Sequence, residues 1–217
     1  DEAGCDRLDE LTLATPLAVP EHGGIALRAT VTAPTADGSR ELTLHSRPED
    51  APDDEWTLHA TGLLARAGTT PAAPAEAWPP ADARPVDLTG FYERLDTDGY
   101  GYGPVFQGLR AAWRHGDDIL AEVALPDDAT DSAGRFTLHP ALLDAALHTT
   151  SLLTTEDGDG VHLPFSFAGV SLTLGGAARC RVTLSPTGTG TGRLALADAT
   201  GAPVATVEAL TMRPASA

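Results

Sequence analysis

Hydrophobic and polar residues alternate through much of the first third of the chain, and this pattern predicts β-strands. Residues 25–32, with the sequence IALRATVT, alternate over most of their length, as expected of a strand with one covered face. Asp37-Gly38 follows them and is a typical hairpin turn. The expected strands are residues 8–19, 25–32, 41–46 and 56–65, which we interpret as an antiparallel meander with one face buried.

The second half of the chain has a different pattern, in which one helix is flanked by strands on both sides. Residues 109–115 and 119–125 alternate around Gly116-Asp117, which predicts a hairpin. Residues 87–95 are typical of a short helix. The remaining expected strands, separated by glycine-rich turns, are residues 161–174, 179–184, 193–197 and 204–213.

The apolar run TLHPALLDAALH, residues 137–148, predicts the most buried helix of the chain. Pro140 suits a first helical turn, because its missing N–H costs nothing there and its φ angle is already helical. Apolar residues such as Leu142 and Leu147 then occupy every side, so we expect a core helix enclosed by the flanking strands. We expect it to extend to about residue 154.

Asp144 is the only formally charged residue in this run. A carboxylate inside a core must be paired, hydrogen-bonded or protonated, and its desolvation raises its pKa. Such a carboxylic acid can donate a proton near neutral pH. His148 lies one turn further along the same helical face and can interact with it. The alternative is a structural aspartate bonded to local hydroxyls or amides.

A glycine- and aromatic-rich loop, GYGYGPVFQGL at residues 99–109, precedes the predicted hairpin. Its glycines permit tight backbone conformations, and Tyr100, Tyr102 and Phe106 can supply pocket walls. It lacks the Lys-Ser/Thr ending of a phosphate-binding loop.

A proline-rich segment, residues 67–86, divides the chain. It is either an extended linker between domains at residues 1–66 and 87–217, or a long surface loop within one domain. In both cases we expect it at the surface, connecting two sheets that pair into one continuous sheet. Its prolines are Pro71, Pro74, Pro79, Pro80 and Pro85.

Composition narrows the range of partners. At 217 residues with 42% hydrophobic residues, the chain can form one large domain or two small ones. The net charge of −17 argues against nucleic acid and anionic membranes as partners. No apolar run is long enough to span a membrane, and we expect a cytoplasmic location. All 14 basic residues are arginine, which we associate with a high-GC bacterial genome.

The two cysteines do not suggest metal or redox chemistry. Cys5 and Cys180 are isolated, without the paired spacing of zinc or disulfide-exchange motifs. We expect reduced thiols and no bound metal.

Three motifs, in a fixed order, give the chain a family resemblance. They are YGPVFQG at residues 102–108, HPALLDAALH at 139–148 and LPFSF at 163–167. With them the chain resembles the dehydratase domain of modular type I polyketide synthases. The sequence DELTLATPL at residues 9–17 also resembles the strand that follows the family's first helix, so the resemblance covers essentially the whole chain.

The resemblance implies an α+β double-hotdog fold, in which each of two antiparallel sheets wraps a central helix. It implies dehydration of a β-hydroxyacyl chain carried on the phosphopantetheine arm of an acyl carrier protein. A histidine of the first hotdog removes the α-proton, and the aspartate of the second protonates the departing hydroxyl. The expected partners are the carrier protein, the other domains of the synthase and a second copy in a homodimer, with no cofactor of the domain's own.

The resemblance also assigns roles to residues of this chain. Asp144 matches the catalytic aspartate, Tyr102 the tyrosine that forms a hydrogen bond in the pocket, and His148 a position where many members have glutamine. His148 is expected to orient Asp144. The residues expected to contact the acyl substrate are Gly103, Pro104, Phe106, Gln107, Leu143, Pro164, Phe165 and Ser166.

The chain departs from the family at the catalytic base. None of its seven histidines begins the family's motif H-x-x-x-G-x-x-x-x-P, and Asp1 aligns just after the first hotdog's helix. We therefore expect uncovered apolar side chains on the first sheet, namely Leu13, Ile25, Leu27 and Leu44. Three hypotheses follow: a dehydratase seen in whole or in part, an inactive double-hotdog scaffold, and a related pyran-forming cyclase. His139, before Pro140, is expected to be a helix cap or a turn residue.

Overall fold

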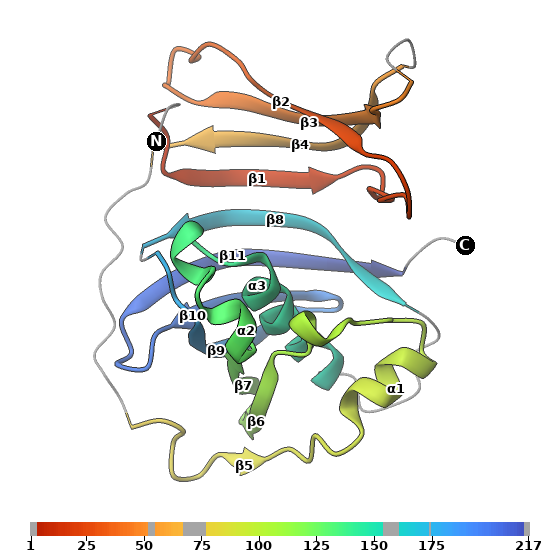
Figure 1. Ribbon diagram of the computed structural model, residues 1–217. Helices are drawn as coiled ribbons and strands as arrows, with labels where there is room; N and C mark the ends of the chain where they lie inside the picture. Colours follow the sequence, from red (N-terminus) through yellow and green to blue (C-terminus); the bar gives the residue numbers. More distant parts are fainter. Residues whose placement is uncertain (1–3, 52–54, 67–76, 154–160, 174, 215–217) are drawn as a thin grey trace.

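The computed structural model describes residues 4–51, 55–66, 77–153, 161–173 and 175–214. Its strands form one eleven-stranded sheet in the order β2-β3-β4-β1-β8-β11-β10-β9-β7-β6-β5 (Figure 1). All strand pairs in this sheet are antiparallel. The strands are β1 (Arg7–Leu13), β2 (Ile25–Val31), β3 (Arg40–Pro48), β4 (Thr57–Ala65), β5 (Arg84–Pro85), β6 (Leu109–His115), β7 (Asp118–Ala124), β8 (His162–Leu172), β9 (Arg179–Gly188), β10 (Thr191–Ala197) and β11 (Pro203–Pro214). The helices are α1 (Phe91–Thr97), α2 (Asp127–Thr130) and α3 (Pro140–Leu147), with short 3-10 turns η1 (Pro104–Phe106), η2 (Ala133–Arg135) and η3 (His148–Leu152).

Strand β1 joins the two halves of the molecule. Leu11 lies opposite Gly62 of β4 on one side and opposite Phe167 of β8 on the other. The guanidinium of Arg7 reaches across β8 to the carboxylate of Glu208 on β11, at 3.2 and 3.0 Å. The expectation that two sheets pair into one continuous sheet is therefore confirmed.

The same pairing corrects the predicted meander. Strands β2, β3 and β4 follow one another, but β1 lies beside β4 and not beside β2. The connection from Leu13 to Ile25 is too long for a tight hairpin and contains two prolines, so it does not hold β1 next to β2.

The first sheet has an apolar face that the described residues leave open. Residues directly opposite one another in neighbouring strands share a face, and one face carries the row Thr30, Thr43, Thr61 and Thr12. The other face carries Leu11, Leu13, Leu27, Ala29, Val31, Leu42, Leu44 and Ala60.

The exposure of this apolar face confirms one expectation and corrects another. Leu27 is 68% exposed and Leu44 37%, as expected, while Leu13 and Ile25 are half-buried. In the part of the chain that the structure describes, the predicted buried face is therefore uncovered mainly along β2 and at Leu44, whereas Ala60 of β4 is buried.

Helix α3 lies within the curve of the second sheet and forms the centre of its core (Figure 1). Leu142, Ala145 and Ala146 are fully buried, and Leu147 is half-buried. The helix begins at Pro140 as expected but ends at Leu147 and continues as the 3-10 turn η3.

The early end of the α-helix has a local cause. The hydroxyls of Thr149 and Thr150 donate to the carbonyls of Ala146 and Leu147, three residues back, at 2.6 and 2.7 Å. Such bonds compete with regular helical pairing and favour the tighter turn. Residue 154, the predicted end, lies outside the described residues.

Helix α1 begins later than residue 87, where the sequence predicted its start. The Asp87 carboxylate accepts a hydrogen bond from the Thr89 N–H at 2.9 Å, which forms a turn instead. Gly90, at φ 67°, then leads into the helix. None of the described helices is long and apolar enough to cross a membrane.

The described end of the proline-rich segment packs on the second half of the molecule. The Trp78 indole N–H donates to Glu122 of β7 at 3.1 Å, and Arg84–Pro85 adds a short strand beside β6. Residues 67–76, which include Pro71 and Pro74, lie outside the described residues.

Candidate active site

Helix α3 carries Asp144 and His148 on one face. Asp144 Oδ2 and His148 Nε2 are 3.2 Å apart, and the His148 side chain is 2% exposed. The start of the helix is fixed by His139, whose Nδ1 accepts the Ala141 N–H at 3.2 Å. The expectation that His139 is a cap is confirmed.

The exposure of Asp144 differs from the sequence prediction. Its side chain is 35% exposed, so the carboxylate is not carried into the core. The apolar positions of α3 are covered by the second sheet, whereas the face with Asp144 is open in the described chain. One carboxylate oxygen is held by a buried imidazole, and the side chain remains accessible to solvent.

Tyr92 of α1 completes the surroundings of His148 and was missed by the sequence analysis. Its hydroxyl lies 3.2 Å from His148 Nδ1 and accepts the Leu109 N–H at 2.8 Å. Burial raises the pKa of Tyr92 above its usual value. The sequence contained one signal for this role, a tyrosine beside the apolar residues of a short predicted helix. A buried tyrosine hydroxyl needs a hydrogen-bond partner, which points to a neighbouring polar group.

Tyr102 also packs against His148, next to Tyr92, whose ring centroid lies 6.3 Å from that of Tyr102. The ring centroids of Tyr102 and His148 are 4.2 Å apart, and Tyr102 stacks on Tyr100 at 6.0 Å and 9°. Burial, and secondly the charge of Asp144, raise the pKa of Tyr102 far above its usual value. The hydroxyl therefore keeps its proton at neutral pH and is available as a donor.

The motif around Tyr102 is held by its own contacts. The Gln107 side-chain amide donates to the Tyr102 carbonyl at 2.9 Å. Gly103 leads into η1, which contains Pro104 and Phe106 and packs against α3. Phe106 is 37% exposed, so its ring is available to a ligand.

Gly108 brings this motif close to helix α3. A Cβ atom at Gly108 would lie 2.8 Å from the Ala145 Cβ and 3.0 Å from the Ala124 carbonyl. Gly108→Ala is therefore expected to lower the free energy of unfolding by about 1–3 kcal/mol through overpacking, measured by chemical denaturation. Gly103→Ala is the matched control, because nothing lies within 4 Å of its Cβ position and its φ of −66° is ordinary. Equal stability of the two variants would contradict the close packing.

The other expected substrate residues are less directly connected to Asp144. Leu143 precedes it on α3 and is half-buried. Pro164, Phe165 and Ser166 lie on β8, where Ser166 pairs with Thr12 of β1. Hydrogen bonds and ring contacts link Asp144, His148, Tyr92 and Tyr102. Among the described residues, none of these contacts involves the three β8 residues. The Phe165 ring instead lies 3.3 Å below the guanidinium carbon of Arg213.

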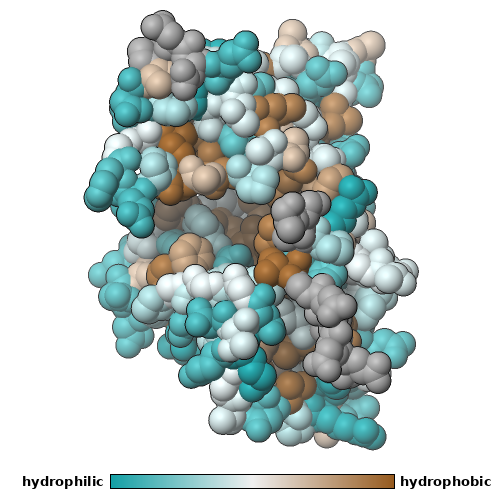
Figure 2. All heavy atoms as spheres, turned by 90° about the vertical axis from the view of Figure 1, so that its right-hand side faces the viewer, coloured by the Kyte–Doolittle hydropathy of each residue, from teal (hydrophilic) through white to brown (hydrophobic). Residues whose placement is uncertain are grey.

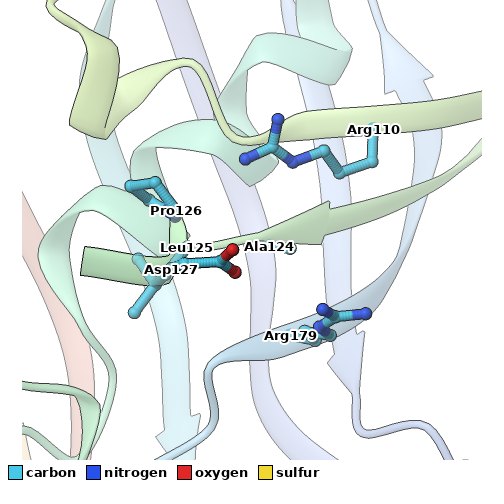
Figure 3. A pocket seen from close by; sticks show the side chains of 6 residues that line it. All are labelled: Arg110, Ala124, Leu125, Pro126, Asp127 and Arg179. Carbon is cyan, nitrogen blue, oxygen red and sulfur yellow. The ribbon is translucent and has the colours of Figure 1, made fainter. Parts of the chain in front are cut away.

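Hydrophobic side chains surround a hollow between the upper and lower parts of the molecule (Figure 2). A different cavity, of about 430 Å³, lies where β7 ends and β9 begins, and Arg110, Asp127 and Arg179 are among the residues that line it (Figure 3). It includes none of the residues around Asp144, so we do not assign it to the same site.

Metal ligands and reactive thiols are not part of the cluster around Asp144. The described residues contain no group of three or more His, Cys, Asp or Glu side chains that could hold a metal ion. Cys180 is buried, and burial raises its pKa to about 12.

The curved antiparallel sheet around α3, joined edge to edge with a second antiparallel sheet, defines a double-hotdog protein with an aspartate-histidine pair on its central helix. Residues 70–217 match the family described as "Polyketide synthase dehydratase N-terminal domain". The chain belongs to the dehydratase family of polyketide synthases.

Similar proteins include long synthases and isolated dehydratase domains. The polyketide synthase GfsB of Streptomyces halstedii is 51% identical over 99% of this chain, which corresponds to only 4% of the synthase. A solved structure from work on dehydratase substrate selection for the borrelidin and fluvirucin polyketide synthases is 46% identical, with a TM-score of 0.92. It covers 99% of this chain, and the match spans 76% of that protein.

Two solved structures concern inactive mutants of the dehydratase from the CurK module of the curacin polyketide synthase. One has an aspartate-to-asparagine substitution and is 25% identical to this chain, with a TM-score of 0.83. The other has a histidine-to-phenylalanine substitution and is 26% identical, with the same TM-score. They cover 95% and 97% of this chain and are matched over 73% and 74% of their own lengths.

Proposed function

We propose that this chain is the part of a synthase dehydratase that carries the catalytic acid. The reaction is removal of water from a β-hydroxyacyl thioester on an acyl carrier protein, which yields an α,β-unsaturated thioester. The observation that supports this most is the open carboxylate of Asp144 beside the buried His148. The inactive aspartate-to-asparagine mutant of the CurK dehydratase also supports it.

In this mechanism, Asp144 acts as the general acid. A base takes the α-proton, and its electron pair forms the new double bond. The β-carbon–oxygen bond breaks as Asp144 transfers its proton to the hydroxyl, which leaves as water. Hydroxide is a poor leaving group, so protonation is the contribution required of this residue. The carboxylate that results can accept a hydrogen bond from His148 Nε2, 3.2 Å away.

We infer that the base is a histidine encoded before Asp1. The histidine-to-phenylalanine mutant of the CurK dehydratase is inactive. In that protein the two substituted residues are separated by more residues than precede Asp144 here. We use the term extended domain for this chain joined to the proposed segment that carries the histidine.

We further propose an acyl site formed by residues around η1, on α3 and on β8. The exposed ring of Phe106 and the positions Gly103, Pro104 and Gln107 would form one wall, with Leu143 behind them. Pro164, Phe165 and Ser166 would form another wall from β8, close to its junction with β1. In this arrangement residues 1–66 form the remainder of the first hotdog and residues 87–217 the second.

Product analysis tests the assignment. The extended domain is incubated with a 3-hydroxyacyl carrier protein that also has a distal hydroxyl, and the acyl group is released and identified. An open-chain α,β-unsaturated acid supports a dehydratase. A cyclic ether identifies the pyran-forming cyclase, and unchanged hydroxy acid identifies the inactive scaffold.

The proposed partners are an acyl carrier protein, the other domains of the synthase and a second copy of the domain. Carrier proteins are usually acidic, so a chain with a net charge of −17 gains little from long-range attraction. Covalent tethering replaces that attraction by raising the local concentration to roughly the millimolar range.

A free carrier protein is therefore expected to bind weakly, and more tightly at higher salt. The reason is that salt screens repulsion between two acidic proteins. Titration calorimetry across a salt series measures this, with the carrier fused to the extended domain as the comparison. A tight complex at low salt that weakens on adding salt would contradict the prediction.

A further inference from the structure

The hydroxyl of Tyr92 lies between a backbone donor and the ring of His148. The Leu109 N–H donates to the hydroxyl oxygen at 2.8 Å, and His148 Nδ1 lies 3.2 Å from the same oxygen. The two rings meet edge to face, with centroids 5.6 Å apart. On its other side the imidazole faces Asp144 through Nε2.

The proton of this hydroxyl determines the tautomer of His148. A tyrosine hydroxyl has one proton, and the Leu109 N–H already occupies one of the lone pairs on its oxygen. Within the described chain, Nδ1 of His148 is the acceptor at hydrogen-bond distance from it. Burial raises the pKa of Tyr92, so the proton stays on the oxygen at neutral pH. Nδ1 then accepts, so an imidazole that carries a single proton carries it on Nε2.

We propose that Tyr92 is a positioning residue that holds His148 in the Nε2–H tautomer and thereby directs the reactive proton of Asp144 toward the substrate. With Nε2–H as a donor, Oδ2 of Asp144 serves as the acceptor, and the carboxyl proton is kept on Oδ1. In the opposite tautomer, the Nε2 lone pair would compete with the substrate for that proton. This inference rests on the proposed function, in which Asp144 is the acid.

A purely structural role for Tyr92 makes a different prediction. A buried tyrosine that only satisfies the Leu109 N–H would leave the tautomer of His148 unaffected. The ring nitrogens of His148 therefore separate the two roles without reference to turnover.

The direct test is nitrogen NMR of the extended domain labelled at histidine. In the wild type, His148 is expected to show a protonated Nε2 and an unprotonated Nδ1. Tyr92→Phe is expected to produce a mixture of both tautomers. Tyr100→Phe is the matched control, because the Tyr100 hydroxyl bonds the His162 carbonyl at 2.9 Å and not His148. A wild-type ring protonated on Nδ1 or on both nitrogens would overturn the proposal, as would a tautomer unchanged in Tyr92→Phe.

Kinetics provide a second test, based on His148→Gln. Tyr92→Phe is expected to lower kcat about tenfold in the wild type, with little change in KM, because orientation of the acid is lost and binding is kept. A glutamine has no tautomers, so in the His148→Gln background the same change is expected to cost no more than about twofold. Equal losses in both backgrounds, in variants that keep the wild-type circular dichroism spectrum, would assign Tyr92 a structural role only. A failed proposed function would give no turnover in any variant while leaving the NMR result intact.

Discussion

Replacing Asp144 by asparagine is expected to slow dehydration by the extended domain by roughly two or more orders of magnitude. In the wild type, Asp144 Oδ2 lies 3.2 Å from His148 Nε2. The asparagine amide keeps the shape of the side chain and a hydrogen-bonding atom facing Nε2, but it has no acidic proton. Loss of the acid should appear in kcat rather than in KM, because a group that acts only in the transition state contributes little to ground-state binding. Initial rates with a 3-hydroxyacyl carrier protein measure this.

The fold of this variant is expected to survive. The Asp144 side chain is 35% exposed, so its charge makes only a small contribution to stability. Asp117→Asn is the matched control, because Asp117 is an exposed aspartate in the turn between β6 and β7 and takes no part in the contacts described around Asp144. Near-normal turnover by Asp144→Asn would remove this residue from the mechanism.

A polypeptide of residues 1–217 alone is expected to show no dehydration above background. A general base contributes about 10²–10⁴-fold to proton transfer. Three of the seven histidines already have other contacts: His139 caps α3, His148 bonds Asp144, and His59 bonds Ser46 and the Thr15 carbonyl in the first sheet. Ultraviolet absorbance of the enoyl thioester follows the reaction. Enzyme-dependent product from this polypeptide would show that one of its seven histidines is the base.

The same polypeptide is expected to be poorly soluble or molten in its first half. The apolar face of β1–β4 is open in the described chain, with Leu27 68% exposed, and an exposed apolar face of this kind favours association. Hydrogen exchange is therefore expected to be fast in β2 and β3 and slow in β7 and β10. Equally slow exchange in both halves would contradict this expectation.

Local pattern was sufficient to predict most of the second half of the molecule. The hairpin β6–β7 lies within one residue of its predicted bounds, because alternation and the Gly116-Asp117 turn are local signals. The start of α3 at Pro140 and the pairing of Asp144 with His148 follow from helical geometry in the same way.

Features that depend on distant contacts could not be predicted from the sequence. The position of β1 is set by pairing with β4, about 50 residues away in the chain, and with β8, more than 150 residues away. Local alternation of hydrophobic and polar residues carries no information on such distant pairing. The exposure of Asp144 depends on what covers the open side of α3 and not on the apolar residues of the helix itself. The partnership of Tyr92 with His148 joins residues 56 apart in the chain.

The most direct test of the account is the mass of the acyl group on a 3-hydroxyacyl carrier protein after incubation with three proteins. These are the extended domain, its Asp144→Asn variant and the polypeptide of residues 1–217. The account predicts that the extended domain removes the mass of one water from each acyl group, while the other two leave the mass unchanged. An unchanged mass with the extended domain, or loss of water with Asp144→Asn at a comparable rate, would contradict it.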